Sequence, residues 1–154
     1  MPKPKDVDQE THVALAKFLF NGAWKLIGLE ERTPEQVETM LHTAHAARYH
    51  WAAAGGGPQQ LAVSDWQLAR VYALAGDVDR SRHYAVLCLD RALENGLEPW
   101  VEASAHEAFA RAAKVAGDKG TRRAEIALAD AALTRVTDAE DRSIIENDLR
   151  DLRD

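Results

Sequence analysis

The sequence predicts an all-α protein of seven helices, and three observations lead to that fold class. Apolar residues recur at intervals of three and four along most of the chain, as they do on one face of an α-helix. Capping residues, glycines and prolines divide this pattern into segments of helical length. A helix, a Gly-Asp turn and a second helix occupy residues 66–96, and the same plan recurs further along the chain. No segment has the alternating pattern of a β-strand.

Residues that start and stop helices set the bounds of each element in turn. Thr33 and Gln36 form a capping box around Pro34, which is favourable in the first turn of a helix. Pro58 and Pro99 open the third and the fifth helix for the same reason. The expected helices cover residues 8–29, 34–54, 58–75, 78–95, 99–116 and 120–136, followed by a last helix after a second capping box at 137–140.

Each expected helix carries a stripe of apolar residues that predicts its inward side. The last helix has Ile145, Leu149 and Leu152 on one side and charges elsewhere, which predicts a polar-backed helix that covers the end of a helical stack. Cys88 lies in a stripe of small residues, which predicts a buried and unreactive thiol. The stripes of the first two helices are Leu15, Leu19, Ala23, Leu26 and Ile27, and then Val37, Leu41, Ala44 and Trp51.

Composition narrows the class of protein. The 154 residues suffice for one domain, expected at 8–154 after a loose N-terminal tail at 1–7, and the 46% hydrophobic and 29% charged content is that of a globular chain. A net charge of −6 disfavours nucleic-acid binding, which requires a basic face. The single cysteine, and the lack of an apolar run long enough for a signal peptide or a membrane span, predict a cytoplasmic protein with no membrane association.

The organising helical pair resembles a known repeat. Leu68-Ala69-x-x-Tyr72, Gly76-Asp77 and Ser81-x-x-x-Ala85 are similar to the tetratricopeptide (TPR) hairpin, although Ala69 stands where that family has a glycine. The Gly-Asp turn recurs 41 positions later, at Gly117, against about 34 in the standard repeat. The resemblance implies a TPR-like right-handed superhelix of three antiparallel helical hairpins plus a C-terminal capping helix, and an interaction role with no reaction attached. An ordinary antiparallel bundle is the alternative.

A groove on the first helices of the hairpins is the predicted binding site. At about 100° per residue, Trp66 and Arg70 lie on one side of the third helix. The same offsets from the next turn select Glu107 and Arg111, and a third alignment selects Asn21 and Trp24. Tryptophan rings supply contact area and guanidinium groups clamp carboxylates, so the expected ligand is an anionic peptide segment, a partner protein or an acidic small molecule. The alternative is that both arginines are surface residues, with Arg111 paired to Glu107 four residues earlier.

The second helix carries the only concentration of potential metal ligands. His42, His45 and His50 fall within nine residues, and Glu38 precedes His42 by one helical turn. Such spacing can present ligands to a divalent metal on one face of a helix. The runner-up function is therefore a metal- or small-molecule-binding protein, conceivably an enzyme, that uses His42, His45, His50 and His83 with Arg70.

Simpler roles for these histidines remain open. An acidic residue precedes a histidine by four positions in Glu38-His42, Asp79-His83 and Glu102-His106, and each set predicts an ion pair on a helix surface. No cofactor motif is present: the glycine run at 55–57 has no following lysine, and no Ser-His-Asp spacing nominates a triad.

Asp65 is out of place on the apolar side of its helix. A carboxylate there needs a partner, and Arg48 lies at a matching height on the preceding helix, which predicts an Asp65–Arg48 ion pair. A third kind of function, a purely structural role through self-association such as a homodimer, is also left open.

Overall fold

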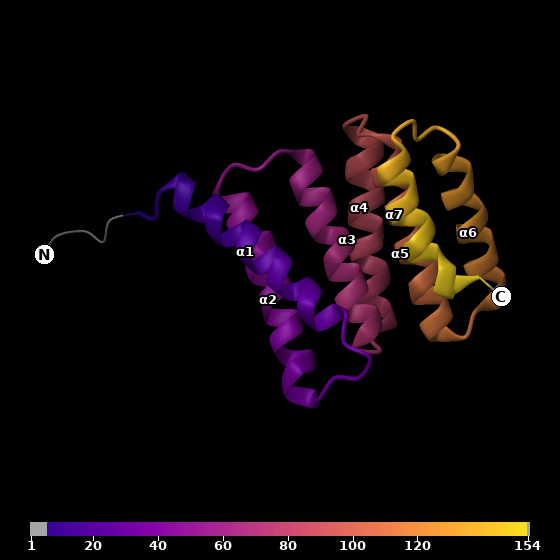
Figure 1. The fold of residues 1–154 in the computed structure, drawn as a ribbon, viewed down its shortest axis with the longest axis horizontal. Coiled ribbons are helices and arrows are strands. Elements are labelled where there is room, and N and C mark those ends of the chain that lie inside the picture. The colour runs from indigo at the N-terminus through magenta and orange to yellow at the C-terminus, as the bar shows by residue number, and fades with distance from the viewer. Residues whose placement is uncertain (1–5, 154) are drawn as a thin grey trace, which may run out of the picture.

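The computed structural model describes residues 6–153, and within that range the fold is all-α, without strands. Of the tail expected at 1–7, residues 1–5 lie outside the described residues. The part of the chain described contains seven α-helices and a short 3-10 helix. The pairs α1–α2, α3–α4 and α5–α6 follow one another from left to right in Figure 1, and α7 lies against α5. They are α1 (Gln9–Ile27), α2 (Pro34–Ala53), α3 (Pro58–Leu74), α4 (Val78–Glu94), α5 (Pro99–Ala116), α6 (Lys119–Leu133), α7 (Ala139–Leu149) and η1 (Arg150–Leu152).

The repeated Gly-Asp turn has the geometry that the sequence predicts. Gly76 and Gly117 have φ values of 80° and 73°, a left-handed conformation that favours glycine. Asp77 and Asp118 then cap α4 and α6 by accepting hydrogen bonds from the backbone N–H three residues later. These hydrogen bonds lower the pKa of the Asp77 carboxyl below its ordinary value.

The expected capping box at 33–36 is confirmed, and the second one is wrong by one residue. Thr33 accepts from the Gln36 N–H, and the Gln36 side chain accepts from the Thr33 N–H. In the second case Asp138, rather than Thr137, caps the helix and accepts from the Asp141 N–H at 2.9 Å. A carboxylate carries more negative charge than a hydroxyl, so Asp138 is the better acceptor for this N–H.

Two helices end earlier than their apolar pattern suggests. After Leu133 the backbone changes from four-residue to three-residue hydrogen bonds, so α6 stops before Val136. After Ile27 the side chain of Arg32 turns back and donates to the carbonyls of Leu26, Ile27 and Leu29. These bonds satisfy the carbonyl groups that the end of α1 leaves unpaired.

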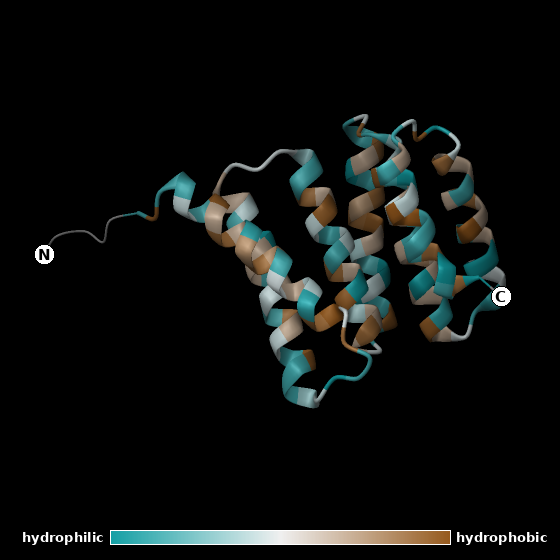
Figure 2. Cartoon of the chain, in the orientation of Figure 1, coloured by the Kyte–Doolittle hydropathy of each residue, from teal (hydrophilic) through white to brown (hydrophobic). Residues whose placement is uncertain are grey.

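Consecutive helices pack as pairs along the stack. α1 packs with α2, α3 with α4, and α5 with α6, and α3 also contacts α5 directly. Hydrophobic (brown) and hydrophilic (teal) residues alternate along the helices in Figure 2, the pattern of amphipathic helices. Cys88 is fully buried between α3, α4 and α5, as predicted, and burial raises the pKa of its thiol.

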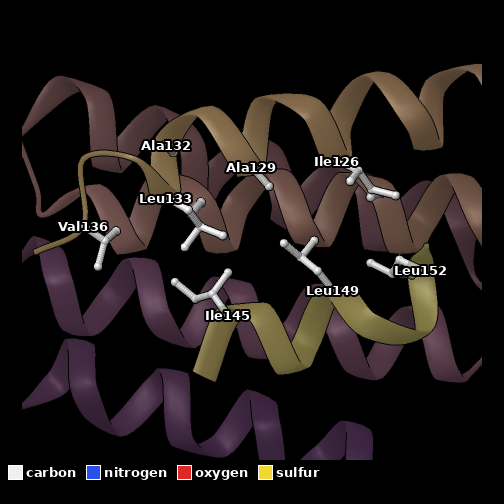
Figure 3. Packing of buried hydrophobic residues seen from close by; sticks show 10 residues of the cluster. Ile126, Ala129, Ala132, Leu133, Val136, Ile145, Leu149 and Leu152 are labelled. Carbon is white, nitrogen blue, oxygen red and sulfur yellow. The ribbon is translucent and has the colours of Figure 1, made fainter. Parts of the chain in front are cut away.

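α5 is the most enclosed helix, since 11 of its 18 residues are buried. Most of the buried positions are alanines, whose small side chains let the surrounding helices approach closely on several sides. α7 covers one side of α5 and α6: Ile145, Leu149 and Leu152 are buried against Ile126 and Leu133 of α6, which confirms the predicted apolar side of the last helix (Figure 3).

The other end of the stack is less covered. Leu15, expected to face inward on α1, is 37% exposed, while its neighbour Ala16 is fully buried. In the described part of the chain α1 packs mainly on α2 and only slightly on α3, so its apolar stripe is wider than the surface that covers it.

Candidate functional site

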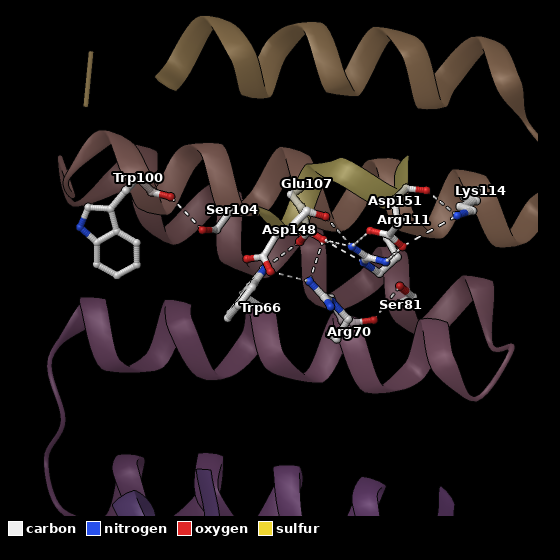
Figure 4. Close-up of polar contacts among 11 residues, drawn as sticks. Trp66, Arg70, Ser81, Trp100, Ser104, Glu107, Arg111, Lys114, Asp148 and Asp151 are labelled. Atoms are coloured by element: carbon white, nitrogen blue, oxygen red, sulfur yellow. Dashed lines mark hydrogen bonds and ion pairs between the residues drawn. The ribbon is translucent and has the colours of Figure 1, made fainter. Parts of the chain in front are cut away.

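Three of the six predicted site residues donate hydrogen bonds to the carboxylate of a fourth, Glu107. Glu107 is 1% exposed and accepts hydrogen bonds from Trp66 Nε1 at 2.8 Å, from Arg70 at 3.0 Å and from Arg111 Nε at 2.8 Å. Trp66 and Arg70 come from α3, while Glu107 and Arg111 come from α5 (Figure 4). The sequence therefore identified a set of residues that the fold does bring together.

Two further carboxylates complete this arrangement, Asp148 from α7 and Asp151 from η1. Asp148 Oδ1 lies 3.4 Å from Arg70, and both terminal nitrogens of Arg111 contact Asp151, at 2.8 and 3.1 Å. Arg111 also donates to the backbone carbonyl of Asp148 at 2.8 Å. We refer to this set as the Glu107 cluster: Trp66, Arg70, Glu107, Arg111, Asp148 and Asp151.

Burial and charge act in opposite directions on the ionisable groups of the Glu107 cluster. Burial raises the pKa of Asp148 to about 6, with Glu107 adding to the rise and Arg70 and Arg111 opposing it. Burial alone would lower the pKa of Arg111, but Glu107 and Asp151 outweigh this effect and raise the pKa above its ordinary value. The pKa of Asp151 is lowered, because Arg111 outweighs the effect of burial. Arg111 therefore stays charged, and both arginines already have carboxylate partners within the chain.

The anion clamp predicted from Arg70 and Arg111 is thus engaged internally. A carboxylate ligand would have to displace Asp148 or Asp151 to reach these guanidinium groups. The Glu107–Arg111 pair expected as the simpler interpretation is present, but the two side chains are buried rather than on the surface.

The remaining two predicted residues lie on α1. The Trp24 ring is 5.2 Å from the Trp66 ring, and the Arg70 guanidinium lies 5.8 Å from the centres of both rings. This geometry is typical of a cation–π contact. Asn21 is exposed and, among the described residues, makes no hydrogen bond with the Glu107 cluster.

The four candidate metal ligands make separate contacts. His42 is exposed beside Glu38, and His83 is exposed beside the Tyr84 ring. His45 Nε2 is 2.7 Å from the Tyr72 hydroxyl, and His50 Nδ1 is 2.8 Å from His12 Nδ1. Within residues 6–153, no group of three or more His, Cys, Asp or Glu side chains is placed to hold a metal ion.

His45 and Arg70, both named for the alternative function, contact different parts of the molecule. Arg70 points to Glu107 in α5, while burial lowers the pKa of His45, which packs against Tyr72 and Tyr84. Side chains on neighbouring helices can therefore face different partners.

One of the expected acid–histidine contacts is present, and another is replaced by a contact with another helix. The Glu38–His42 contact is present at 3.7 Å between exposed side chains. The Glu102–His106 pair is wrong: His106 Nδ1 contacts Glu125 of α6 at 2.8 Å, and Glu102 pairs with Arg135. A buried histidine gains more from a partner across the helix interface than from one on its own helix.

The predicted Asp65–Arg48 pair is confirmed, with an additional partner. Asp65 is 1% exposed, and Arg48 Nε donates to it at 3.1 Å. Arg91 of α4 donates to the other carboxylate oxygen at 3.3 Å. Burial raises the pKa of Asp65, and the two arginines oppose that rise. One carboxylate therefore links three helices, α2, α3 and α4.

The four tryptophans form one surface, of which the sequence predicted only Trp24 and Trp66. All four tryptophans of the chain are half-buried and connected: Trp24 contacts Trp66, Trp66 and Trp100 line a cavity of about 180 Å³, and Trp51 and Trp100 line another of about 230 Å³. We call this surface the tryptophan face. Trp51 lies in the last turn of α2 and Trp100 in the first turn of α5. Because neighbouring helices alternate in direction, counting from the turns could have placed both at the same level along the helix axes.

Comparisons with known proteins give no relative for this chain. No protein-family model, curated protein or solved structure matches it. None of the helices in residues 6–153 combines the length and hydrophobicity that a membrane span requires. The function must therefore be inferred from the contacts and cavities of the chain itself.

Proposed function

We propose that the chain is a small TPR-like binding protein that takes a peptide segment of a partner protein along the tryptophan face. In this proposal α1–α2, α3–α4 and α5–α6 are three antiparallel hairpins of a right-handed superhelix, and α7 is the capping helix. The recurrence of the Gly-Asp turn, the pairwise packing and the contact between α3 and α5 support this architecture. The binding site is the tryptophan face, to which α1, α2, α3 and α5 each contribute one ring.

The observation that carries the proposal is the gathering of all four tryptophans on one surface. They come from four helices that are separated in sequence, and each remains partly accessible. Tryptophan is enriched in the residues that dominate binding energy, because it offers a large rigid area and an N–H donor. Here the rings line two neighbouring cavities that share Trp100, a suitable arrangement for successive side chains of a bound segment.

The charge of the bound segment is a separate question. The predicted preference for an anionic segment stays a prediction. Internal pairing weighs against it, because Arg70 and Arg111 already contact Glu107, Asp148 and Asp151. The proposal therefore relies on ring contacts rather than on the arginines.

The test is a peptide selection followed by affinity measurement. A random peptide library is selected on the wild-type protein, and the enriched peptides are measured against Trp24→Ala, Trp100→Ala and the control Leu93→Ala. Leu93 is 59% exposed on α4, so the control removes an apolar side chain elsewhere on the surface. We expect the two tryptophan variants to lose about thirtyfold in affinity, a loss of about 2 kcal/mol per binding hot spot, and the control to match the wild type.

Folding of the variants is checked by thermal unfolding before binding is measured. Equal affinity for all four proteins would show that the peptides bind elsewhere and would refute the assignment of the site. Comparison of acidic, neutral and basic peptides from the same selection tests the predicted anionic preference independently.

A further inference from the structure

The larger cavity of the tryptophan face has a composition of its own. It lies where α1, the end of α2 and the first turns of α3 and α5 meet, and its volume is about 230 Å³. Rings from Phe20, Trp51 and Trp100 line it together with Val63. The rest of the lining comes from the exposed amides of Gln59 and Gln60 and from the side chain of Ser64. We call it the aromatic pocket.

The lining selects a neutral and largely apolar occupant. None of its side chains is ionisable, so a charged group would lose hydration without gaining a partner. The volume is below the roughly 300–1,000 Å³ of sites for drug-sized molecules, and it therefore suits a single side chain. Aromatic rings pack favourably edge-to-face against other rings, which favours an aromatic side chain over an aliphatic one.

Ser64 adds a polar requirement to this apolar pocket. The residue is 1% exposed, and its hydroxyl oxygen has no hydrogen-bond partner within the described chain. Gln67, one turn further along α3, uses its amide nitrogen to donate to the Phe20 carbonyl, while its own side-chain oxygen is also buried and unpaired. A buried hydroxyl without a partner costs roughly 1–3 kcal/mol, so an occupant that bonds to Ser64 recovers that cost.

We propose that the aromatic pocket binds a tyrosine side chain of the partner's peptide segment, with the phenol hydroxyl hydrogen-bonded to Ser64. A phenol hydroxyl both donates and accepts, so it can pair with the Ser64 hydroxyl in either direction. The ring packs against Trp51 and Trp100, whose separation along the sequence explains why only the folded chain forms this pocket. This inference rests on the proposed function and adds the identity of one ligand side chain.

The experiment uses small probes that carry a single ring. N-acetyl-L-tyrosinamide, N-acetyl-L-phenylalaninamide and p-cresol are titrated into ¹⁵N-labelled protein, with the indole signals of Trp51 and Trp100 and the amide signal of Ser64 as reporters. We expect N-acetyl-L-tyrosinamide to give saturable shifts at these three signals and none at Leu128, which is exposed on α6. The phenylalanine probe should bind about fivefold more weakly, which corresponds to one hydrogen bond of about 1 kcal/mol.

Two serine variants separate the hydrogen bond from the packing. Ser64→Ala should bind both probes equally, because the hydroxyl that distinguishes them is gone, while the ring contacts remain. Ser143→Ala is the matched control: Ser143 is exposed on α7, and this variant should keep the wild-type preference for tyrosine. Ser64→Ala removes only an unpaired group, so its thermal unfolding should confirm a folded protein.

Three results would overturn the inference. The first is the absence of saturable shifts at Ser64, Trp51 and Trp100. The second is equal affinity of the wild type for the tyrosine and phenylalanine probes. The third is binding of p-cresol without binding of N-acetyl-L-tyrosinamide, which would assign the pocket to a free small molecule.

The outcome is distinguishable from that of the proposed function. Selected peptides that bind and shift only Trp24 and Trp66 would uphold a peptide-binding face and refute a tyrosine in the aromatic pocket. If the selection yields no binding peptide, the proposed function fails, and a peptide source for the tyrosine fails with it.

Discussion

The two ends of the helical stack are covered to different degrees, and the difference separates the part that stabilises the fold from the part available for binding. At the α7 end, Ile145, Leu149 and Leu152 are at most 2% exposed, and Glu107 is buried among its partners. At the α1 end, Leu15 is 37% and Phe18 is 72% exposed. Both ends are built from the same kind of helical pair, so the covering helix makes the difference.

The polar residues follow the same division. Where α7 and η1 pack on α5, Glu107 and Arg111 are buried and paired with each other, and Arg111 also pairs with Asp151. Beside these residues, the rings of Trp24 and Trp66 remain half-exposed, and the aromatic pocket between α1, α2, α3 and α5 stays open. A buried ion cluster is expensive to disturb, whereas half-exposed rings gain from further burial. Binding is therefore expected at the uncovered end.

The largest expected effect compares two leucines from the two ends. Leu149→Ala should lower the free energy of unfolding by about 2–5 kcal/mol, because the side chain is 0% exposed and its loss leaves a cavity. Leu15→Ala should cost less than about 1 kcal/mol, since the side chain is already in partial contact with water. Urea unfolding of both variants measures the two values. Equal losses would mean that the ends are equally well packed and would remove the basis of the comparison.

The sequence anticipated the elements and their caps better than the placement of the last helix. Thr33, Gly76 and Asp118 act through neighbouring backbone groups, so local rules predict their roles. The Asp65–Arg48 pair followed from helical periodicity, because α2 and α3 are adjacent in the chain. Local rules cannot decide where α7 packs, since one apolar stripe fits several surfaces. The choice of Asp148 and Asp151 as partners of the arginines was therefore not predictable.

The functional surface was predicted in part for the same reason. Trp66, Arg70, Glu107 and Arg111 were found by counting from repeated turns, which fixes the face of each helix. The same counting could not show that the arginines have these partners, because Asp151 lies 40 residues beyond Arg111 and Asp148 is still further from Arg70. His106 chose Glu125 over Glu102 through a similar tertiary contact.

The second prediction concerns pH and the covered end. The pKa of Asp148 is raised from 3.8 to about 6, so between these values the folded protein binds more protons than the unfolded chain. Its contribution to stability is therefore present below about pH 4 and is lost as the pH rises through about 6. The displacement corresponds to at most about 3 kcal/mol, and partial solvent screening reduces this to about 1–2 kcal/mol.

Asp148→Asn isolates this contribution. The free energies of unfolding of the wild type and the variant are measured at pH 4.5 and pH 7.5. The difference between them should shift by about 1–2 kcal/mol in favour of the variant at the higher pH, because asparagine has no proton to lose. A difference that stays constant between the two pH values would show that Asp148 has an ordinary pKa and that α7 does not bury it against the neighbouring helices.

The smallest effect tests two buried serines against each other. Ser81 is 0% exposed and donates to the Ala69 carbonyl at 2.8 Å, whereas Ser64, 1% exposed, has no hydrogen-bond partner in the part of the chain described. Ser81→Ala should cost about 1 kcal/mol, because it removes a satisfied hydrogen bond between α4 and α3. Ser64→Ala should leave the free energy of unfolding unchanged or raise it by up to about 1 kcal/mol, because a hydroxyl without a partner only adds the cost of its burial. Urea unfolding of both variants distinguishes the two cases, and an equal loss would show that Ser64 already has a partner in the free protein. A hydroxyl that stabilises nothing in the free protein is best explained by a bound state in which it has a partner.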